Sequence, residues 1–133
     1  MKQEFDWGDS SPSFIELVGG EIFTQKMYEK IFQVQEEDVV LDLGASTGPF
    51  TWSIMDKASK VVVIEPSKFC LPLLTKNTKG YPVEIESKAL SKWEGEEIVN
   101  IFDKEYTEQE VETITFKSII LFVRKGLYRM YCL

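Results

Sequence analysis

The sequence predicts an α/β protein built on a parallel β-sheet with helices against its faces. Two short runs of β-branched residues, Val39–Leu43 and 61–64, have the composition of buried central strands. Between them, residues 50–58 place Phe50 and Ile54 at helical spacing. A strand–helix–strand unit of this kind takes a right-handed crossover, which makes its two strands parallel. A chain of 133 residues is long enough for one domain with its own core.

The N-terminal third leads into this unit. Residues 1–13 are polar and contain Gly8 and Pro12, and a short apolar patch over residues 14–18 follows. We predict a flexible arm over residues 1–19. Residues 21–33 repeat apolar side chains near helical spacing and predict an amphipathic helix covering the sheet.

The strand–helix pattern continues after residue 64. Residues 67–77 predict a helix, which either begins at Ser67 as N-cap or begins near Leu71 with Pro72 in its first turn. Residues 83–86 predict a third strand, followed by an exit loop. Residues 98–102 and 111–116 then alternate in polarity, which predicts an antiparallel hairpin with an acidic connector.

Composition and charge exclude several classes of function. The chain has no histidine and two cysteines, so it lacks a His-based triad and a zinc ligand set, and we expect no metal site. Its net charge of −7 argues against a nucleic-acid partner. No run of about 20 apolar residues predicts a membrane span. Without a signal peptide or a disulfide framework, the prediction is a cytoplasmic protein.

Charge divides the chain unevenly. Acidic residues crowd positions 94–112, whereas the residues after Thr113 carry only basic charges. We therefore predict a cofactor-binding domain over residues 20–120, preceded by the arm and followed by a divergent basic tail over residues 121–133.

The turn after the first strand carries the chemistry. Gly44 and Gly48 allow the backbone to form a tight turn, and the helix that follows offers backbone amides to a ligand. Asp42 ends the first strand and Glu65 ends the second, where a carboxylate can accept hydrogen bonds from ribose hydroxyls. Together these features predict a site for an adenosine-containing ligand.

The spacing of the turn distinguishes between such ligands. Gly-Ala-Ser-Thr-Gly departs from the GxGxxG pattern of dinucleotide sites, and Asp42 would repel a pyrophosphate. An acidic side chain suits the ammonium and sulfonium groups of S-adenosylmethionine. A site for another adenosine ligand is the less favoured alternative.

Four stretches, in order, resemble the FkbM-type family of class I S-adenosylmethionine-dependent methyltransferases. The family motifs DVGANIGFFT, FEP, AALSD and VETITLDDL correspond to residues 42–51, 64–66, 88–92 and 111–119. The resemblance covers residues 20–120 and implies a Rossmann-like three-layer methyltransferase fold with S-adenosyl-L-methionine as cofactor.

The resemblance also implies a set of cofactor-binding residues. The first strand and its turn would hold the methionine part, the end of the second strand the ribose, and residues 87–90 would lie near the adenine. For residues 88–90 an ordinary turn is an equal alternative. The full set is Asp42, Gly44, Ala45, Ser46, Gly48, Glu65, Pro66, Ser67, Lys88, Ala89 and Leu90.

The chain departs from the family after residue 120, where a fourth strand reading roughly KIDVEG is expected. Without that strand, we expect a truncated sheet in which the first strand is an exposed edge. Residues 119–123 could fill this edge, a second copy or a complementing chain could pair with it, or the tail could be a remnant.

The resulting interpretation is an O-methyltransferase with an incomplete acceptor half, acting on a small-molecule or glycan-type acceptor. The alternative is a non-catalytic, cofactor-binding or interaction remnant of such an enzyme. No residue of the sequence can be named as the catalytic base.

Overall fold

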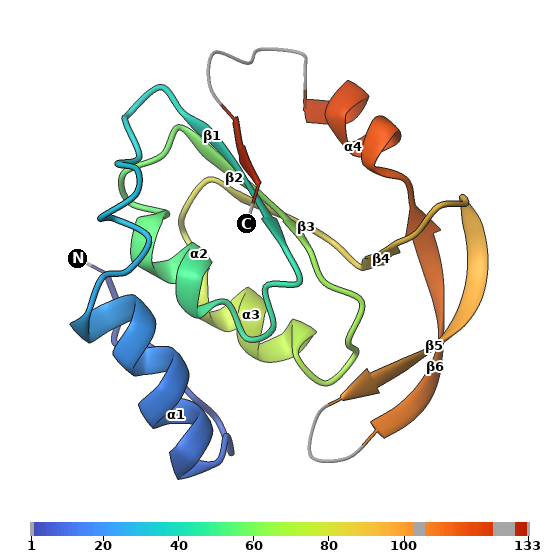
Figure 1. Cartoon of the computed structure of the whole chain (residues 1–133), viewed down its shortest axis with the longest axis horizontal. Helices are drawn as coiled ribbons and strands as arrows, with labels where there is room; N and C mark the ends of the chain where they lie inside the picture. Colours follow the sequence, from blue (N-terminus) through green and yellow to red (C-terminus); the bar gives the residue numbers. More distant parts are fainter. Residues whose placement is uncertain (1, 103–105, 124–129, 133) are drawn as a thin grey trace.

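The computed structural model describes residues 2–102, 106–123 and 130–132 (Figure 1). Its helices are α1 (Pro12–Gly19), the π-helix η1 (Gly20–Thr24), α2 (Pro49–Ile54), α3 (Leu71–Asn77) and α4 (Phe116–Val123). Its strands are β1 (Val39–Leu43), β2 (Lys60–Ile64), β3 (Val83–Glu86), β4 (Lys88–Leu90), β5 (Gly95–Phe102), β6 (Tyr106–Ile114) and β7 (Met130–Cys132).

The main sheet has the strand order β3-β2-β1-β7, and all its neighbouring strands are parallel. Val40 lies opposite Val61, and Val63 lies opposite Ile85. Val40, Val61 and Val63 are fully buried, as their β-branched runs predict for central strands. The parallel α/β sheet is confirmed.

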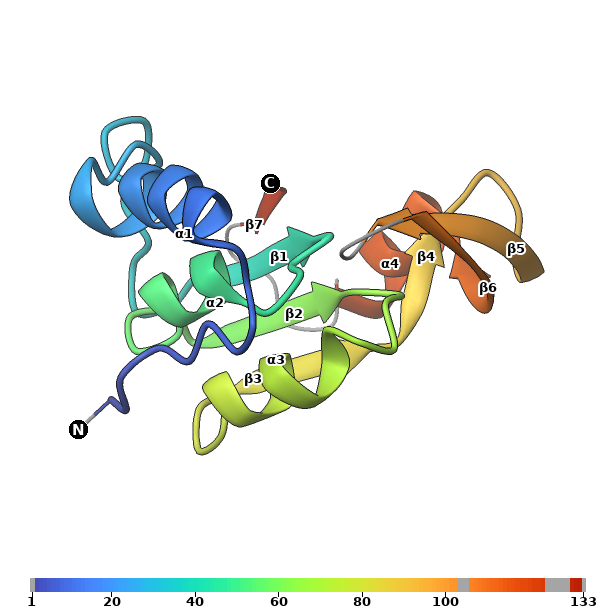
Figure 2. The ribbon, with the colours of Figure 1, turned by 90° about the horizontal axis from the view of Figure 1, so that it is seen from below.

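Helices cover both faces of this sheet, which gives three layers (Figure 2). On one face, Val40 and Val61 pack in a cluster with Phe50, Ile54 and Leu74 of α2 and α3. On the other face, Ile119 of α4 is 1% exposed and packs with the alternate β1 and β2 side chains Leu41, Val62 and Ile64. The fold is therefore the expected Rossmann-like α/β arrangement, with α2 joining the two central strands.

Of the three alternatives for the sheet edge, the one in which residues 119–123 fill it as a strand is wrong, because this stretch forms part of α4. A short apolar run is compatible with a buried helix as well as with a strand. Here the Ser118 amide donates to Thr115 Oγ1 over 3.2 Å, an N-terminal capping contact that favours the helix.

The exposed edge expected on β1 is also absent, because β7 pairs with β1 in parallel, from Val39 opposite Met130 to Leu41 opposite Cys132. The proposal that a second copy or another chain completes this edge therefore loses its basis. Part of the tail, residues 124–129 and 133, lies outside the described residues.

A second sheet has the order β4-β6-β5 and lies beside the first (Figure 2). The β5–β6 hairpin is antiparallel, as predicted, but β6 begins at Tyr106 rather than at residue 111. Most of the expected acidic connector is therefore strand, because pairing with β5 satisfies its backbone. Residues 88–90, predicted as a loop, form β4 and pair in parallel with β6.

The N-terminal third differs most from its prediction. The helix expected over residues 21–33 is wrong beyond residue 24. The π-helix η1 continues directly from α1, because Gly19 and Gly20 adopt right-handed helical backbone, and residues 27–31 form turns. The arm is also not detached within the described residues, since Phe5 is 8% exposed. The division into arm, domain and tail stays a prediction. No helix among the described residues is both long and apolar enough to span a membrane.

Candidate functional site

The turn between β1 and α2 is held in an unusual backbone conformation. Gly44, Ser46 and Gly48 all have positive φ, at 76°, 55° and 88°. A Cβ added to Gly48 would lie 2.6 Å from Cδ1 of Leu74, a fully buried side chain of α3. Gly48 is therefore required by both its conformation and its close contact with α3.

Glu65 ties this turn to the end of β2. Its Oε2 accepts a hydrogen bond from the Ser46 amide over 2.7 Å, and its Oε1 accepts one from the Ser67 amide over 2.8 Å. The side chain is 6% exposed. One carboxylate thus fixes the glycine turn and the turn after β2 relative to each other, and it is the group that the sequence predicts for the ribose.

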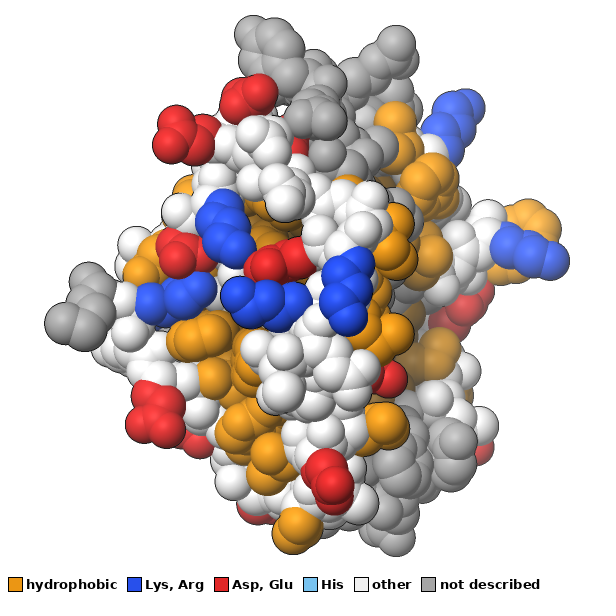
Figure 3. Space-filling view, turned by 60° about the vertical axis from the view of Figure 1, so that its left-hand side comes forward, with side chains coloured by type: hydrophobic (Ala, Val, Ile, Leu, Met, Phe, Trp, Pro, Cys, Tyr) orange, Lys and Arg blue, Asp and Glu red, His pale blue; other side chains and the backbone are white. Residues whose placement is uncertain are grey.

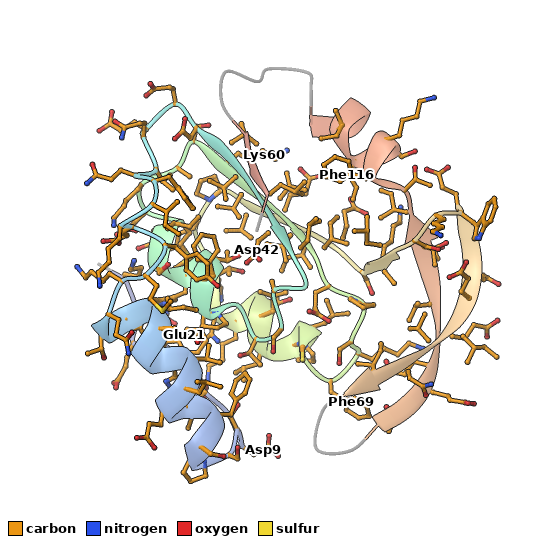
Figure 4. All side chains as sticks on the ribbon, viewed as in Figure 1. Asp9, Glu21, Asp42, Lys60, Phe69 and Phe116 are labelled. Carbon is orange, nitrogen blue, oxygen red and sulfur yellow. The ribbon has the colours of Figure 1, made fainter. Side chains whose placement is uncertain are left out.

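Asp42 lies at the end of β1, on the face of the sheet that α2 covers (Figure 4). It is 4% exposed, and its Oδ2 accepts a hydrogen bond from Thr51 Oγ1 over 2.6 Å. Burial raises the pKa of Asp42 from 3.8 to about 6; the Thr51 hydrogen bond opposes this rise and the charge of Glu65 adds to it. At neutral pH, two carboxylates therefore share this corner of the fold.

These two acids have no countercharge within the part of the chain that the structure describes. Neither Asp42 nor Glu65 forms an ion pair with a described residue, and no cluster there could hold a metal ion. Because a buried charge is costly unless it is paired, this corner is complementary to a cation supplied from outside.

The remaining predicted residues are spread around this corner. Ala45 belongs to the core, and Gly44 donates its amide to the Ile64 carbonyl over 2.8 Å. In β4, Ala89 is buried, Leu90 is 49% exposed, and Lys88 forms an ion pair with Glu86 over 3.6 Å. These three residues are paired with β6 in a strand and do not approach the glycine turn through any described contact.

A cavity of about 370 Å³ lies on the predicted adenine side. Pro66 and Ser87 contribute to it, whereas Asp42 and Glu65 do not line it. Its other lining residues come from the loop after β2 and from the β5–β6 hairpin: Lys68, Glu96, Glu110, Val111 and Glu112. The three glutamates make this cavity unfavourable for a polyphosphate.

Two residues of the site were missed by sequence reasoning. Thr51 donates a hydrogen bond to the Asp42 carboxylate. The sequence offered one indication of this role, a polar side chain next to the apolar positions of α2. Asn77, at the end of α3, has no comparable signal because its partners are distant in sequence. Its Nδ2 donates to the carbonyls of Asp6 and Thr47, and its Oδ1 accepts from the Asp6 amide, with distances of 2.9 to 3.0 Å.

Replacing Asn77 by leucine is expected to lower the free energy of unfolding by about 2–3 kcal/mol, because three part-buried backbone groups lose their partner. The Thr47 carbonyl belongs to the glycine turn, so hydrogen exchange at residues 44–48 should also become faster. Urea unfolding and amide exchange measure the two effects. Asn100→Leu, at an exposed strand position, should change stability by less than about 0.5 kcal/mol, and equal effects of the two variants would contradict the assigned role of Asn77.

Comparison with known proteins places the chain near methyltransferases. No protein-family model matches it. Over 52 residues it is 40% identical to the dimethyladenosine transferases of Saccharomyces cerevisiae and Kluyveromyces lactis. This region is 39% of the chain and 16% of each relative, so the chain matches about a sixth of their length.

Similar solved structures carry related names. A methyltransferase from Listeria monocytogenes, described as S-adenosylmethionine dependent, has a TM-score of 0.46 and 27% identity over 54% of this chain and 33% of its own. An rRNA methylase from Streptococcus thermophilus has a TM-score of 0.40 and 15% identity over 42% of this chain and 36% of its own. The FkbM-type subgroup stays a prediction.

These names correct one expectation from the sequence. The exclusion of a nucleic-acid partner is wrong as an inference about this class, because the similar curated proteins are dimethyladenosine transferases. The exclusion rested on a net charge summed over the whole chain, which says little about one face. The exclusion also treated the charge of this chain as that of a whole protein, although the chain matches only about a sixth of the length of these relatives.

Proposed function

We propose that the corner formed by Asp42, Glu65 and the glycine turn binds S-adenosylmethionine as the donor half of a methyltransferase. The observation that carries this proposal is the pair of buried carboxylates at the ends of β1 and β2, which lack a described ion-pair partner. The cofactor brings an ammonium and a sulfonium to such a site. NAD brings a pyrophosphate, which the same carboxylates repel.

The residues present fit this cofactor. The hydroxyl oxygen of Thr47, in the glycine turn, is buried and has no hydrogen-bond partner among the described residues. Each Glu65 oxygen accepts one backbone hydrogen bond, from Ser46 or from Ser67, and so keeps capacity for a ribose hydroxyl. When bound, the cofactor would supply an activated methyl group, and this chain's own residues would orient it and balance its charge.

The acceptor is a separate part of the proposal. The name of the curated relatives favours an adenosine of RNA as the methyl acceptor. O-methyl transfer of the FkbM type is the second candidate, favoured by the four matching sequence stretches. A methyl-transfer assay with radiolabelled cofactor distinguishes the two acceptors: transfer to unmodified RNA but not to RNA with N6,N6-dimethylated adenosines supports the first, and transfer to a glycan or small-molecule hydroxyl but not to RNA supports the second.

Replacing Glu65 by glutamine is expected to weaken S-adenosylmethionine binding at least tenfold, equal to about 1.4 kcal/mol. The glutamine amide keeps the size of the side chain but loses the charge, and it turns one acceptor into a donor that faces a backbone amide. Isothermal titration calorimetry measures the affinity, and urea unfolding measures the accompanying loss of stability.

Glu37→Gln is the matched control, because Glu37 is an exposed acid in the loop before β1. It should bind the cofactor as the unmodified chain does. Equal affinities for all three proteins would remove Glu65 from the site, and binding of NAD in place of S-adenosylmethionine would contradict the proposed ligand.

A further inference from the structure

A second hollow lies away from the glycine turn, between the π-helix η1 and the outer side of α2. Its volume is about 480 Å³, and an adjoining cavity adds about 260 Å³. The two cavities share the lining residues Ile22, Lys26, Glu29, Ser53 and Lys57, so they form one continuous depression, here called the η1–α2 groove. This is the size range of sites for small organic ligands.

Aromatic rings form one wall of the η1–α2 groove. The ring centroids of Phe5, Phe23 and Trp52 lie 5.3 to 5.9 Å apart in edge-to-face contacts, and Trp7 adds a contact of 4.7 Å with Phe5. Phe23 and Trp52 are only partly buried. The groove therefore presents ring surface to solvent, and such surface favours a flat aromatic ligand.

Three lysines also line the groove: Lys2, Lys26 and Lys57. Lys57 Nζ lies 2.9 Å and Lys26 Nζ 3.9 Å from the Glu29 carboxylate, so two ammonium groups share one acid. Lys2 Nζ lies 4.3 Å from the centroid of the Trp52 ring. The Lys57 hydrogen bond, with the charges of Lys26 and Lys2, lowers the pKa of Glu29. Figure 3 shows basic side chains gathered in a row across a partly apolar face, with acidic side chains between them.

The backbone at the η1–α2 groove is irregular. Residues 20–24 form a π-helix, a rare geometry that is frequent at functional sites. Lys26 has a φ of 49°, which is uncommon for a residue other than glycine. Strained backbone of this kind persists where the surrounding structure requires it. Ile22 and Phe23 of the π-helix, and Lys26 with its positive φ, all line the η1–α2 groove.

We infer that the η1–α2 groove binds a mononucleotide, with its base against Phe23 and Trp52 and its phosphate on the ammonium donors of Lys26 and Lys57 that Glu29 does not use. The aromatic wall is complementary to the base. Lys2 is already paired with Asp56 over 2.9 Å, so the positive charge that faces the phosphate comes from Lys26 and Lys57, which share the single acid Glu29. Glu4 and Glu29 also line the groove, so the phosphate must lie on the lysine side. The inference does not depend on the proposed donor site, because it uses none of the same residues.

Tryptophan fluorescence tests the inference directly. In a Trp93→Phe background, only Trp7 and Trp52 report, and both line the η1–α2 groove. We expect saturable quenching by 5′-UMP, which has no adenine to compete for the donor site. Uridine and inorganic phosphate should each bind at least tenfold more weakly than 5′-UMP, because each supplies only half of the ligand.

Variants locate the site. Lys26→Gln and Lys57→Gln should each weaken 5′-UMP binding about three- to tenfold, whereas Lys79→Gln, an exposed lysine outside the groove, should not. Saturating S-adenosylhomocysteine should leave the 5′-UMP affinity unchanged. Absence of quenching, equal affinities for all variants, or competition by S-adenosylhomocysteine would overturn the inference. A tetrauridylate that binds more than tenfold tighter than 5′-UMP would assign the groove to a strand and overturn the mononucleotide assignment.

Discussion

Replacing Asp42 by asparagine is expected to change the free energy of unfolding more favourably at pH 7.5 than at pH 4, by about 2–2.5 kcal/mol. The reason is the pKa of Asp42, which burial raises from 3.8 to about 6. At about 1.4 kcal/mol for each pKa unit, holding the ionised carboxylate in the folded state costs about 3 kcal/mol at neutral pH.

The sign follows from the direction of this shift. Between pH 3.8 and 6 the folded protein binds more protons at Asp42 than the unfolded chain does. The contribution of Asp42 to stability therefore falls as the pH rises through this window, and the full cost is present above pH 6. Asparagine does not titrate, so the variant lacks this slope.

Urea unfolding of both proteins from pH 4 to pH 7.5 measures the effect. The difference between the two stability profiles is the decisive quantity, because any fixed cost of the new amide cancels from it. Parallel profiles would show that Asp42 is not the buried, unpaired carboxylate that the structure describes. The same variant should bind S-adenosylmethionine at least tenfold more weakly, so a gain in stability would accompany a loss of binding.

Replacing Gly48 by alanine is expected to lower the free energy of unfolding by about 3 kcal/mol or more. The backbone there has a φ of 88°, which strains any residue with a Cβ, and that Cβ would lie 2.6 Å from Leu74 Cδ1. Leu74 is fully buried, so it cannot move aside cheaply. The shifted turn should also lose its affinity for the cofactor.

The chain supplies a matched control at Gly80, where φ is 86° and no atom lies within 4 Å of an added Cβ. Gly80→Ala carries the same conformational strain without the contact and should cost about 1 kcal/mol. The difference between the two variants isolates the contact with Leu74. A second substitution, Leu74→Val, should recover part of the loss in the Gly48→Ala protein only. Equal costs at both glycines would contradict this packing.

The part of the fold that could be predicted is the part whose residues act locally. Val39–Leu43 and residues 61–64 had to be buried strands, because β-branched runs of that length pack in few other ways. Pro72 correctly indicated where α3 begins, since proline is tolerated only in the first turn. Asp42 and Glu65 were brought together as expected, because parallel strands end at the same edge.

The errors lie where distant partners decide the structure. The apolar residues 119–123 fit a strand and a helix equally well, and packing on β1 and β2 selected the helix. Residues 106–110 are too polar to predict a strand, but pairing with β5 makes them one. The hydrogen bonds of Asn77 to Asp6 and Thr47 join residues 71 and 30 positions apart, a separation that leaves no local pattern in the sequence.

Titration calorimetry with S-adenosylmethionine at pH 7.5 and pH 5 tests the donor site most directly. The account predicts binding at pH 7.5 that weakens several-fold at pH 5, where Asp42 becomes protonated and loses the charge that faces the cationic ligand. In the Asp42→Asn protein, the affinity should be low at both values and the pH dependence should be reduced. Strong binding that is indifferent to pH and to Asp42, or binding of NAD alone, would contradict the account.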